Sequence, residues 1–195
     1  MIDHVLARQE RCRIIDIGGT EVYWRIASDH VDDPRIDIDL INLEALPTTR
    51  PNFTSIKADA CDLRNFGDMS YDVVHSNSLI EHVGNWEAMS RLAQNIRRLA
   101  PAYFVQTPYF WFPIEPHFRV PLFHWMPESL RYRMILRRDM GFMSKAASVS
   151  DAVRSVQSAA LLDLVQFSTL FPDAEIIRER VLGLTKSLMA IRPVT

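Results

Sequence analysis

The chain of 195 residues has little cysteine, no block of basic residues and no long apolar run. Cys12 and Cys61 are too few and too isolated for a disulfide framework or a zinc site, which is typical of a reducing compartment. A net charge of -2 without a Lys/Arg cluster argues against a nucleic-acid partner, because such binding needs a positive field. No stretch approaches the ~20 apolar residues of a membrane span, and the first residues, Met1 to Cys12, lack a signal-peptide core. The composition therefore predicts a cytoplasmic protein without a membrane span and leaves its oligomeric state open.

What the chain does contain is enough apolar material for one well-buried core. Hydrophobic residues make up 48% of it and charged residues 24%, and a chain of this length is too short for two comfortable cores. We therefore expect a single domain over residues 1–195.

The segment from Arg13 to Thr20 is an apolar strand that ends in an acid and a glycine pair. Its isoleucines are β-branched and favour a buried strand, with Asp16 near the end. Gly18 and Gly19 allow a sharp turn where a Cβ atom would keep a ligand away. Such a turn is typical of a cofactor loop, but an ordinary tight turn has the same sequence, so the following strands must decide.

Further strands and helices alternate along the chain. Strands are predicted at 13–17, 35–41, 53–58, 71–75 and 103–106, and helices at 21–28, 85–99 and 128–138, with a longer helix from Ser150 or Asp151 to Phe171. Val22, Tyr23 and Ile26 are expected on the buried side of the first helix. Strands at 175–181 and 187–191 are joined so closely that they must be antiparallel. The pattern predicts an α/β fold with a Rossmann-like, doubly wound and mostly parallel sheet of about seven strands that closes with an antiparallel edge hairpin.

Polar or glycine residues follow the strands in series, and ligands of open α/β sheets bind at these carboxyl ends. The ends carry Asp16 with Gly18-Gly19, then Asn42, Asp59-Ala60, and Ser76-Asn77. With this series, residues 13–110 resemble the class I S-adenosylmethionine-dependent methyltransferases, particularly the methyltransferase type 11 group. The resemblance implies a cofactor half at about 13–107, a substrate-wall loop with helices at about 108–172, and closing strands at about 173–192.

The resemblance also implies roles for individual residues. Asp16, with the backbone of Gly18 and Gly19, would hold the methionine end of S-adenosylmethionine. Asn42, or alternatively Asp39, would bind the ribose hydroxyls.

The same resemblance covers the adenine and methyl regions. Asp59 would accept from the adenine amino group while the backbone of Ala60 donates to the ring. Ser76 and Asn77 would line the methyl region, and Thr20 and Leu43 complete the predicted cofactor site. The family's later glycine positions are Thr20 and Val22 here, and Asn42 replaces the usual acid.

The segment from Tyr109 to Trp125 is rich in aromatics and prolines and has no helical period, so we expect part of it to line an acceptor pocket. His117 within it, and His82 after the fourth strand, are the candidate catalytic bases, although a packed or capping histidine is the competing interpretation of His82. Glu115, His117 and His124 match no tight ligand spacing, so no metal site is predicted.

The leading hypothesis is therefore transfer of a methyl group from S-adenosylmethionine to a small-molecule or lipid-like acceptor. Such transfer depends mainly on positioning and desolvation, which suits a sequence without a nucleophile cluster. The alternative is a non-catalytic binding or scaffold protein with a degenerate methyltransferase fold, which Thr20, Val22 and Asn42 favour. Nicotinamide chemistry is disfavoured because the first loop lacks Gly-x-Gly-x-x-Gly.

Overall fold

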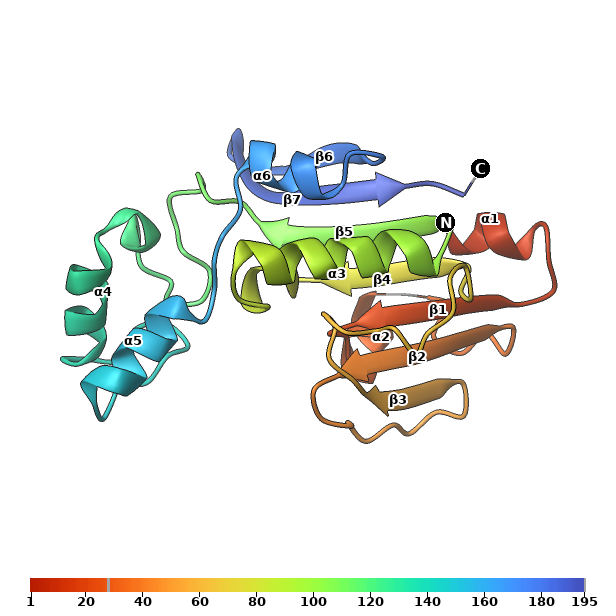
Figure 1. Cartoon of the computed structure of the whole chain (residues 1–195), viewed down its shortest axis with the longest axis horizontal. Coiled ribbons are helices and arrows are strands. Elements are labelled where there is room, and N and C mark those ends of the chain that lie inside the picture. The colour runs from red at the N-terminus through yellow and green to blue at the C-terminus, as the bar shows by residue number, and fades with distance from the viewer. Residues whose placement is uncertain (28, 195) are drawn as a thin grey trace.

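A computed structural model describes residues 1–27 and 29–194. In this part of the chain, seven strands form one sheet in the order β3-β2-β1-β4-β5-β7-β6 (Figure 1). The strands are β1 (Cys12–Ile17), β2 (Ile36–Asn42), β3 (Phe53–Lys57), β4 (Val73–Asn77), β5 (Ala102–Pro108), β6 (Glu175–Val181) and β7 (Leu184–Arg192). The first five run parallel, whereas β7 is antiparallel to β5 and to β6. The predicted Rossmann-like sheet with an antiparallel edge pair is confirmed.

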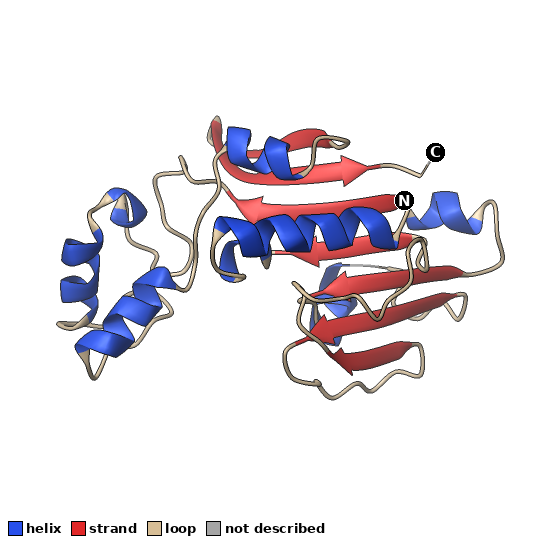
Figure 2. Cartoon of the chain, in the orientation of Figure 1, coloured by secondary structure: helices blue, strands red, loops and turns tan. Residues whose placement is uncertain are grey.

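Helices cover both faces of the sheet (Figures 1 and 2). The helical elements are α1 (Ile2–Leu6), α2 (Glu21–Ala27), η1 (Ile80–His82), α3 (Trp86–Leu99), η2 (Phe123–Trp125), α4 (Glu128–Ile135), α5 (Val149–Gln157) and α6 (Leu164–Leu170). Alternate residues of each buried strand point to opposite faces. Ile15 and Ile17 therefore pack with α3 and α6, while Ile14 packs with α1 and α2.

A third hydrophobic cluster lies apart from the sheet. It is built around Phe118, Phe123, Ile135 and Val156, and it joins the aromatic segment to α4 and α5. These helices stand away from the sheet beyond the carboxyl ends of the parallel strands (Figure 1). Part of the aromatic segment thus forms the core of this small helical unit.

The predicted long helix to Phe171 is wrong, because two helices replace it. The side chain of Ser148, rather than Ser150 or Asp151, accepts a hydrogen bond from Asp151 N and begins α5. A reciprocal cap between Asp163 and Gln166 begins α6. Each cap satisfies backbone N–H groups that a continuous helix would bond internally, so they mark two separate starts.

The predicted buried side of α2 is also wrong for two of its three residues. Val22 is 58% exposed and Ile26 is 83% exposed, while Tyr23 is half-buried. Glu21 and Trp24 take the buried positions. Trp24 donates to Asp16, and Glu21 accepts from Thr49. Hydrophobic periodicity within the helix cannot predict such partners outside it.

The closing hairpin turns more tightly than expected. β7 begins at Leu184, so only Leu182 and Gly183 join it to β6, with φ angles of 50° and 83°. Two successive left-handed residues match the twist of a two-residue hairpin. The antiparallel pairing at the sheet edge is as predicted.

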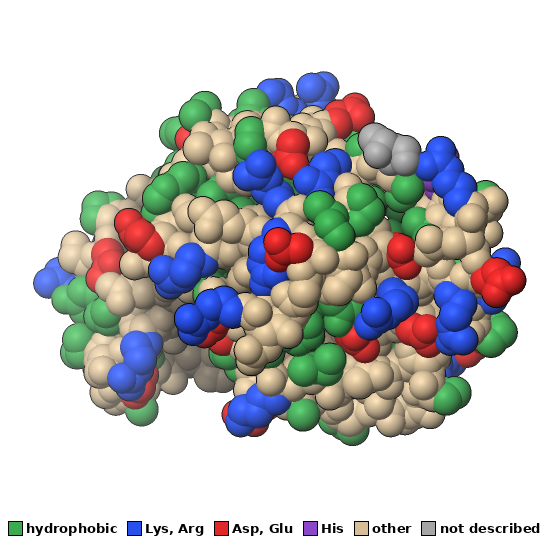
Figure 3. All heavy atoms as spheres, turned by 45° about the vertical axis from the view of Figure 1, so that its right-hand side comes forward, with side chains coloured by type: hydrophobic (Ala, Val, Ile, Leu, Met, Phe, Trp, Pro, Cys, Tyr) green, Lys and Arg blue, Asp and Glu red, His purple; other side chains and the backbone are tan. Residues whose placement is uncertain are grey.

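The surface shows no separation of charge on the face drawn in Figure 3, where Lys and Arg side chains alternate with Asp and Glu. This mixture agrees with the net charge of -2. Among the helices that the structure describes, none has the length and apolar character needed to cross a bilayer.

Candidate functional site

A cavity of about 620 Å³ opens at the carboxyl ends of β1, β2 and β3. Its lining includes five residues of the predicted cofactor site: Gly18, Asn42, Leu43, Asp59 and Ala60. The sequence also predicts His82 near this place, and His82 lies in the lining. Parallel strands bring these separate segments to one sheet edge, as the argument from strand ends requires.

The glycine pair shapes the edge of this cavity. Gly18 has a φ of 83° and donates its N–H to Ile41 O at 2.8 Å, so the turn is tied to the neighbouring strand. A Cβ atom on Gly18 would lie 2.9 Å from the side chain of Leu79. The turn therefore requires glycine both for its backbone angle and for space.

Asp16 lies beneath the turn and not in the cavity lining. Its side chain is fully buried, and its two oxygens lie 2.7 Å from Trp24 Nε1 and 2.7 Å from His75 Nδ1. The carboxylate thus holds α2 and β4 together below Gly19. Its predicted contact with the methionine ammonium remains a prediction.

Asn42 links the second strand to the glycine turn. Its Nδ2 donates to Gly19 O at 2.9 Å, which leaves the amide oxygen as the acceptor for a ligand. Glu44, which was not among the residues predicted from the sequence, also lines the cavity and pairs with Lys57 at 2.9 Å on the surface. Its position two residues beyond Asn42 would have identified it, since a carboxylate after the second strand is what ribose recognition calls for.

Asp59 and Ala60 form the wall beyond β3. Oδ1 of Asp59 accepts from Cys61 N at 2.8 Å, so part of this side chain holds its own loop. Asn95 donates to Ala60 O at 3.1 Å and ties the loop to α3. Leu43 is 70% exposed and adds an apolar side chain to the cavity lining beside this wall.

The other predicted cofactor residues lie outside the cavity lining. Thr20 accepts from Tyr23 N at the start of α2, and Asp39 accepts from the hydroxyl of Tyr71 at 2.7 Å. Ser76 is fully buried and donates to Ile17 O. Asn77 is half-buried at the end of β4 and accepts from Ser78 Oγ. Their contacts are structural, and their roles toward a cofactor stay predictions.

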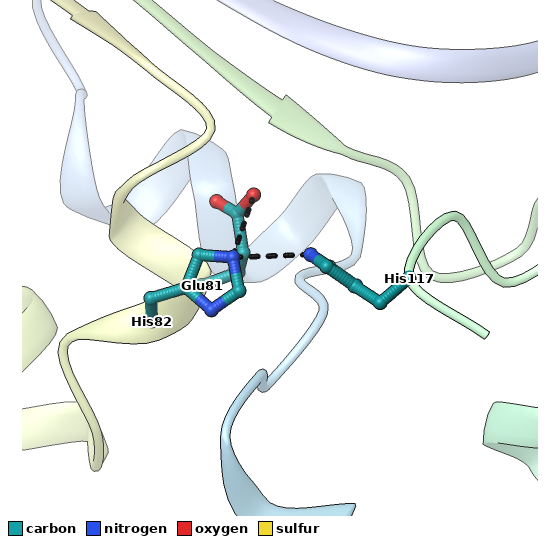
Figure 4. Close-up of side chains that lie close together, drawn as sticks. All are labelled: Glu81, His82 and His117. Carbon is teal, nitrogen blue, oxygen red and sulfur yellow. Dashed lines mark hydrogen bonds and ion pairs between the residues drawn. The ribbon is translucent and has the colours of Figure 1, made fainter. Parts of the chain in front are cut away.

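The two candidate catalytic histidines, far apart in the sequence, meet in the structure. His82 Nε2 and His117 Nε2 lie 3.0 Å apart, and Glu81 stands beside them (Figure 4). Glu115 accepts from His117 Nδ1 at 2.7 Å, and this bond raises the pKa of His117 above its ordinary value. Burial raises the pKa of Glu81.

A second cavity, of about 320 Å³, adjoins this cluster through Glu115 and Ala160. Its lining includes Phe110, His124 and Arg131 from the aromatic segment and α4. Burial lowers the pKa of His124, whose Nε2 lies 2.7 Å from Phe110 O. The aromatic segment thus supplies a wall with both apolar and polar groups.

Comparisons with known proteins agree with this fold. Residues 25–101 match the sequence profile of a protein family whose description is "Methyltransferase domain". A SAM-dependent methyltransferase from Methanosarcina mazei shares 13% identity over 98% of this chain and 95% of its own, with a TM-score of 0.54. No curated protein compared with the sequence matches it.

Two further solved structures share the fold. A possible exported protein from Bordetella parapertussis shares 14% identity over 99% of this chain and 66% of its own, with a TM-score of 0.57. An O-methyltransferase family protein from Burkholderia thailandensis shares 18% identity over 96% of this chain and 52% of its own, with a TM-score of 0.52. The chain thus spans less than two thirds of either protein. With the profile match, these structures confirm the resemblance to class I methyltransferases: the chain has their fold and, over 25–101, their sequence pattern.

Proposed function

We propose that the protein binds S-adenosylmethionine in the 620 Å³ cavity and transfers its methyl group to a small-molecule or lipid-like acceptor. The observation that carries this proposal is the meeting of Gly18, Asn42 and Asp59 around one cavity at the ends of three neighbouring strands. A cytoplasmic location and the single-domain organisation remain predictions of the sequence.

The residues of the cavity fit the cofactor. A volume of about 620 Å³ lies within the range of small-molecule sites, roughly 300–1,000 Å³. The amide oxygen of Asn42 and the carboxylate of Glu44 are acceptors for two hydroxyls, and Asp59 is an acceptor for an amino group. Leu43 and Val83 supply apolar surface for a ring.

The chemistry expected of the site is simple. S-adenosylmethionine supplies a methyl group on a positively charged sulfur, which is a good leaving group. This chain's residues would hold the donor, exclude water and orient the acceptor, which is where such enzymes gain rate. His82 lines the donor cavity and His117 contacts His82 from the aromatic segment, so the pair would lie beside an acceptor that enters along the aromatic wall.

A binding or scaffold role is the second candidate. Thr20 and Val22 stand where the family has glycines, and the Asp16 carboxylate already has two protein partners. Both features suit a chain that kept the fold and lost turnover.

Calorimetric titration of the full chain with S-adenosylmethionine, its demethylated product and NAD tests the proposal. Asp59→Ala should weaken binding by about 1–3 kcal/mol, the cost of an unpaired partner. Asp62→Ala is the matched control, because Asp62 lies outside the cavity lining and pairs with exposed Arg64. Because Asp59 also accepts a hydrogen bond from Cys61 N, thermal melts of both variants are needed to separate a loss of stability from a loss of cofactor binding.

The outcomes separate the candidates. Binding of S-adenosylmethionine and not NAD, with loss only in Asp59→Ala, supports the proposal. Binding of NAD alone would overturn it. Transfer of a labelled methyl group to a molecule of a small-molecule or lipid extract distinguishes an enzyme from a binding protein that holds the cofactor without turnover.

A further inference from the structure

We propose that Glu81, His82 and His117 bind a divalent transition-metal ion through Oε1 of the glutamate and Nε2 of each histidine (Figure 4). These side chains come from η1 and from the aromatic segment, and their candidate ligand atoms all lie within 4.8 Å of one another. His82 also lines the donor cavity, but the assignment rests on the contacts within the cluster and not on the proposed cofactor.

The hydrogen bonds of the two histidines place the hydrogen of each neutral ring on Nδ1, so that Nε2 of each neutral ring carries a lone pair. His82 Nδ1 lies 2.8 Å from the carbonyl oxygen of Ser158, which can only accept, so Nδ1 carries the hydrogen. His117 Nδ1 likewise donates to the Glu115 carboxylate at 2.7 Å. In neutral rings, two lone pairs then face each other across 3.0 Å. A cation between them, either a metal ion or a shared proton, removes this repulsion.

The same hydrogen bonds are those that orient metal-binding histidines. A histidine that binds a metal through Nε2 usually donates Nδ1–H to a carboxylate or a backbone carbonyl, which fixes the tautomer and the ring. His117 has the carboxylate and His82 has the carbonyl.

Glu81 gives an independent indication. Its side chain is 1% exposed, and Oε2 accepts from Thr107 Oγ1 at 2.9 Å. Oε1 has no hydrogen-bond partner and lies 3.9 Å from His82 Nε2. A buried carboxylate oxygen without a partner is costly unless a cation or a donor faces it.

The charge of the cluster favours a dication over a proton. Glu81 and Glu115 are both buried, at 1% and 3% exposure, and both face the histidine pair. With both carboxylates ionised, a single shared proton would leave one of them uncompensated, whereas a divalent ion balances both. Buried charges persist in proteins when they are paired or bind metals.

The donor set and spacing suit zinc or a related ion. Imidazole nitrogens select zinc, iron, nickel or copper over calcium and magnesium. Ligand bonds of ~2.0–2.1 Å in a tetrahedral site separate the ligand atoms by about 3.3 Å. Two of the observed separations, 3.0 Å and 3.9 Å, bracket that value, and the third pair lies within 4.8 Å, so side-chain rotations that draw Glu81 and His117 together complete the site. Three protein ligands leave a position for water or another oxygen donor.

This assignment changes the role of the histidines. An Nε2 atom that binds a metal cannot also accept a proton, so His82 and His117 would act as ligands and not as free bases. Sequence spacing suggested only Glu115, His117 and His124 as a set to consider, whereas the structure combines His117 with Glu81 and His82 of η1.

The test is a zinc titration of the untagged full chain after removal of metal with a chelator, followed by calorimetry and elemental analysis. Wild type should bind one equivalent. Glu81→Gln, His82→Asn and His117→Gln each remove a ligand atom and should weaken zinc binding more than the loss of an orienting partner does. Glu115→Gln should weaken it by about 10- to 100-fold, as loss of an orienting partner does. His124→Gln is the matched control, since His124 lies in the same segment but outside the cluster.

A second measurement does not depend on variants that fold. Ring nitrogen NMR of the wild type should show zinc-dependent shifts of Nε2 in His82 and His117, and cobalt should give the visible bands of a four- or five-coordinate site. Absence of zinc binding in wild type, or equal loss in His124→Gln, overturns the assignment and leaves a shared proton between the histidines. Zinc binding without S-adenosylmethionine binding would overturn the proposed function alone, and the reverse result would overturn only the metal site.

Discussion

The carboxylate of Asp16 fills the space directly beneath Gly19: a Cβ atom at Gly19 would lie 1.6 Å from Asp16 Oδ2. That carboxylate is itself fixed by Trp24 and His75. The sequence Asp-x-Gly-Gly therefore has a packing reason in addition to any role in cofactor binding. Asp16 requires glycine at position 19 because a Cβ atom there would occupy the space that the carboxylate fills.

Replacement of Gly19 by alanine should destabilise the fold severely. Asp16 would have to leave Trp24 and His75, and an unpaired buried carboxylate adds to the steric cost, so we expect a loss of about 3 kcal/mol or more in the free energy of unfolding. Gly67→Ala is the control, because its Cβ would meet only Ser70 Cβ at 3.7 Å. Urea unfolding of both variants measures the difference. A loss below about 0.5 kcal/mol for Gly19→Ala would contradict this packing account.

The two cysteines should report on cavity occupancy. Burial raises the pKa of Cys12 to about 12, and its side chain is fully inaccessible, so it should not react with iodoacetamide until the protein unfolds. Cys61 is partly exposed and lines the cavity, although burial raises its pKa as well. We expect slow alkylation of Cys61 in the native protein, and slower alkylation still with S-adenosylmethionine present.

Peptide mass spectrometry of the alkylated protein follows both sites in one sample, with Cys12 as the internal measure of unfolding. Protection of Cys61 that increases with cofactor concentration places the ligand in this cavity. Alkylation of Cys61 at an unchanged rate, in a sample where calorimetry shows saturation, would place it elsewhere.

Features of the fold and the site that depend on local sequence could be predicted, whereas those that depend on contacts between residues distant in the sequence could not. The parallel strands and the polar residues at their ends follow from local patterns, and Gly18, Asn42 and Asp59 do meet at one cavity. The burial of Glu21 and Trp24 depends on partners outside their helix, so helical periodicity gave the wrong face. The contact between His82 and His117 joins residues 35 positions apart, and no short spacing rule predicts it.

Glu21 should stabilise the protein in a manner that acid removes. Hydrogen bonds from the Thr49 side chain, with further bonds from Thr49 N and Arg50, lower the pKa of Glu21 below its ordinary value of 4.5. A carboxyl group whose pKa is lower in the folded state contributes stability above its unfolded pKa and loses it as the pH falls through the folded value. The contribution of Glu21 should therefore be full at neutral pH and decline below about pH 4.5.

Glu21→Gln tests this dependence. At neutral pH, the variant should lose about 1–3 kcal/mol, as expected for hydrogen bonds to a charged group, and its stability should approach that of wild type as the pH falls below 4.5. Exposed Glu10→Gln is the control. Urea midpoints measured across this pH range give the comparison. A difference between Glu21→Gln and wild type that does not shrink in acid would assign the effect to packing and not to the charge.

The exposed part of the aromatic segment should matter for the acceptor and not for the cofactor. Trp111 is 58% exposed, lies outside the donor cavity, and contacts Phe110 and Trp125 with ring centroids 4.9 Å and 5.9 Å away. Phe123, by contrast, is 1% exposed in the core of the helical unit.

Trp111→Ala should therefore leave S-adenosylmethionine affinity and melting temperature nearly unchanged and reduce transfer of labelled methyl by about tenfold or more, the effect of about 1.4 kcal/mol of lost acceptor contact. Phe123→Ala should instead cost about 3–5 kcal/mol of stability, as large-to-small core changes do. Trp111 lines neither cavity itself but contacts Phe110, which lines the second; Phe142→Ala is the matched control, since Phe142 is an exposed aromatic residue, at 67%, that is also outside both linings. If Trp111→Ala transfers methyl as well as Phe142→Ala does, or loses activity only in proportion to folded protein, the segment is a hydrophobic cover for its own helices and the acceptor binds elsewhere.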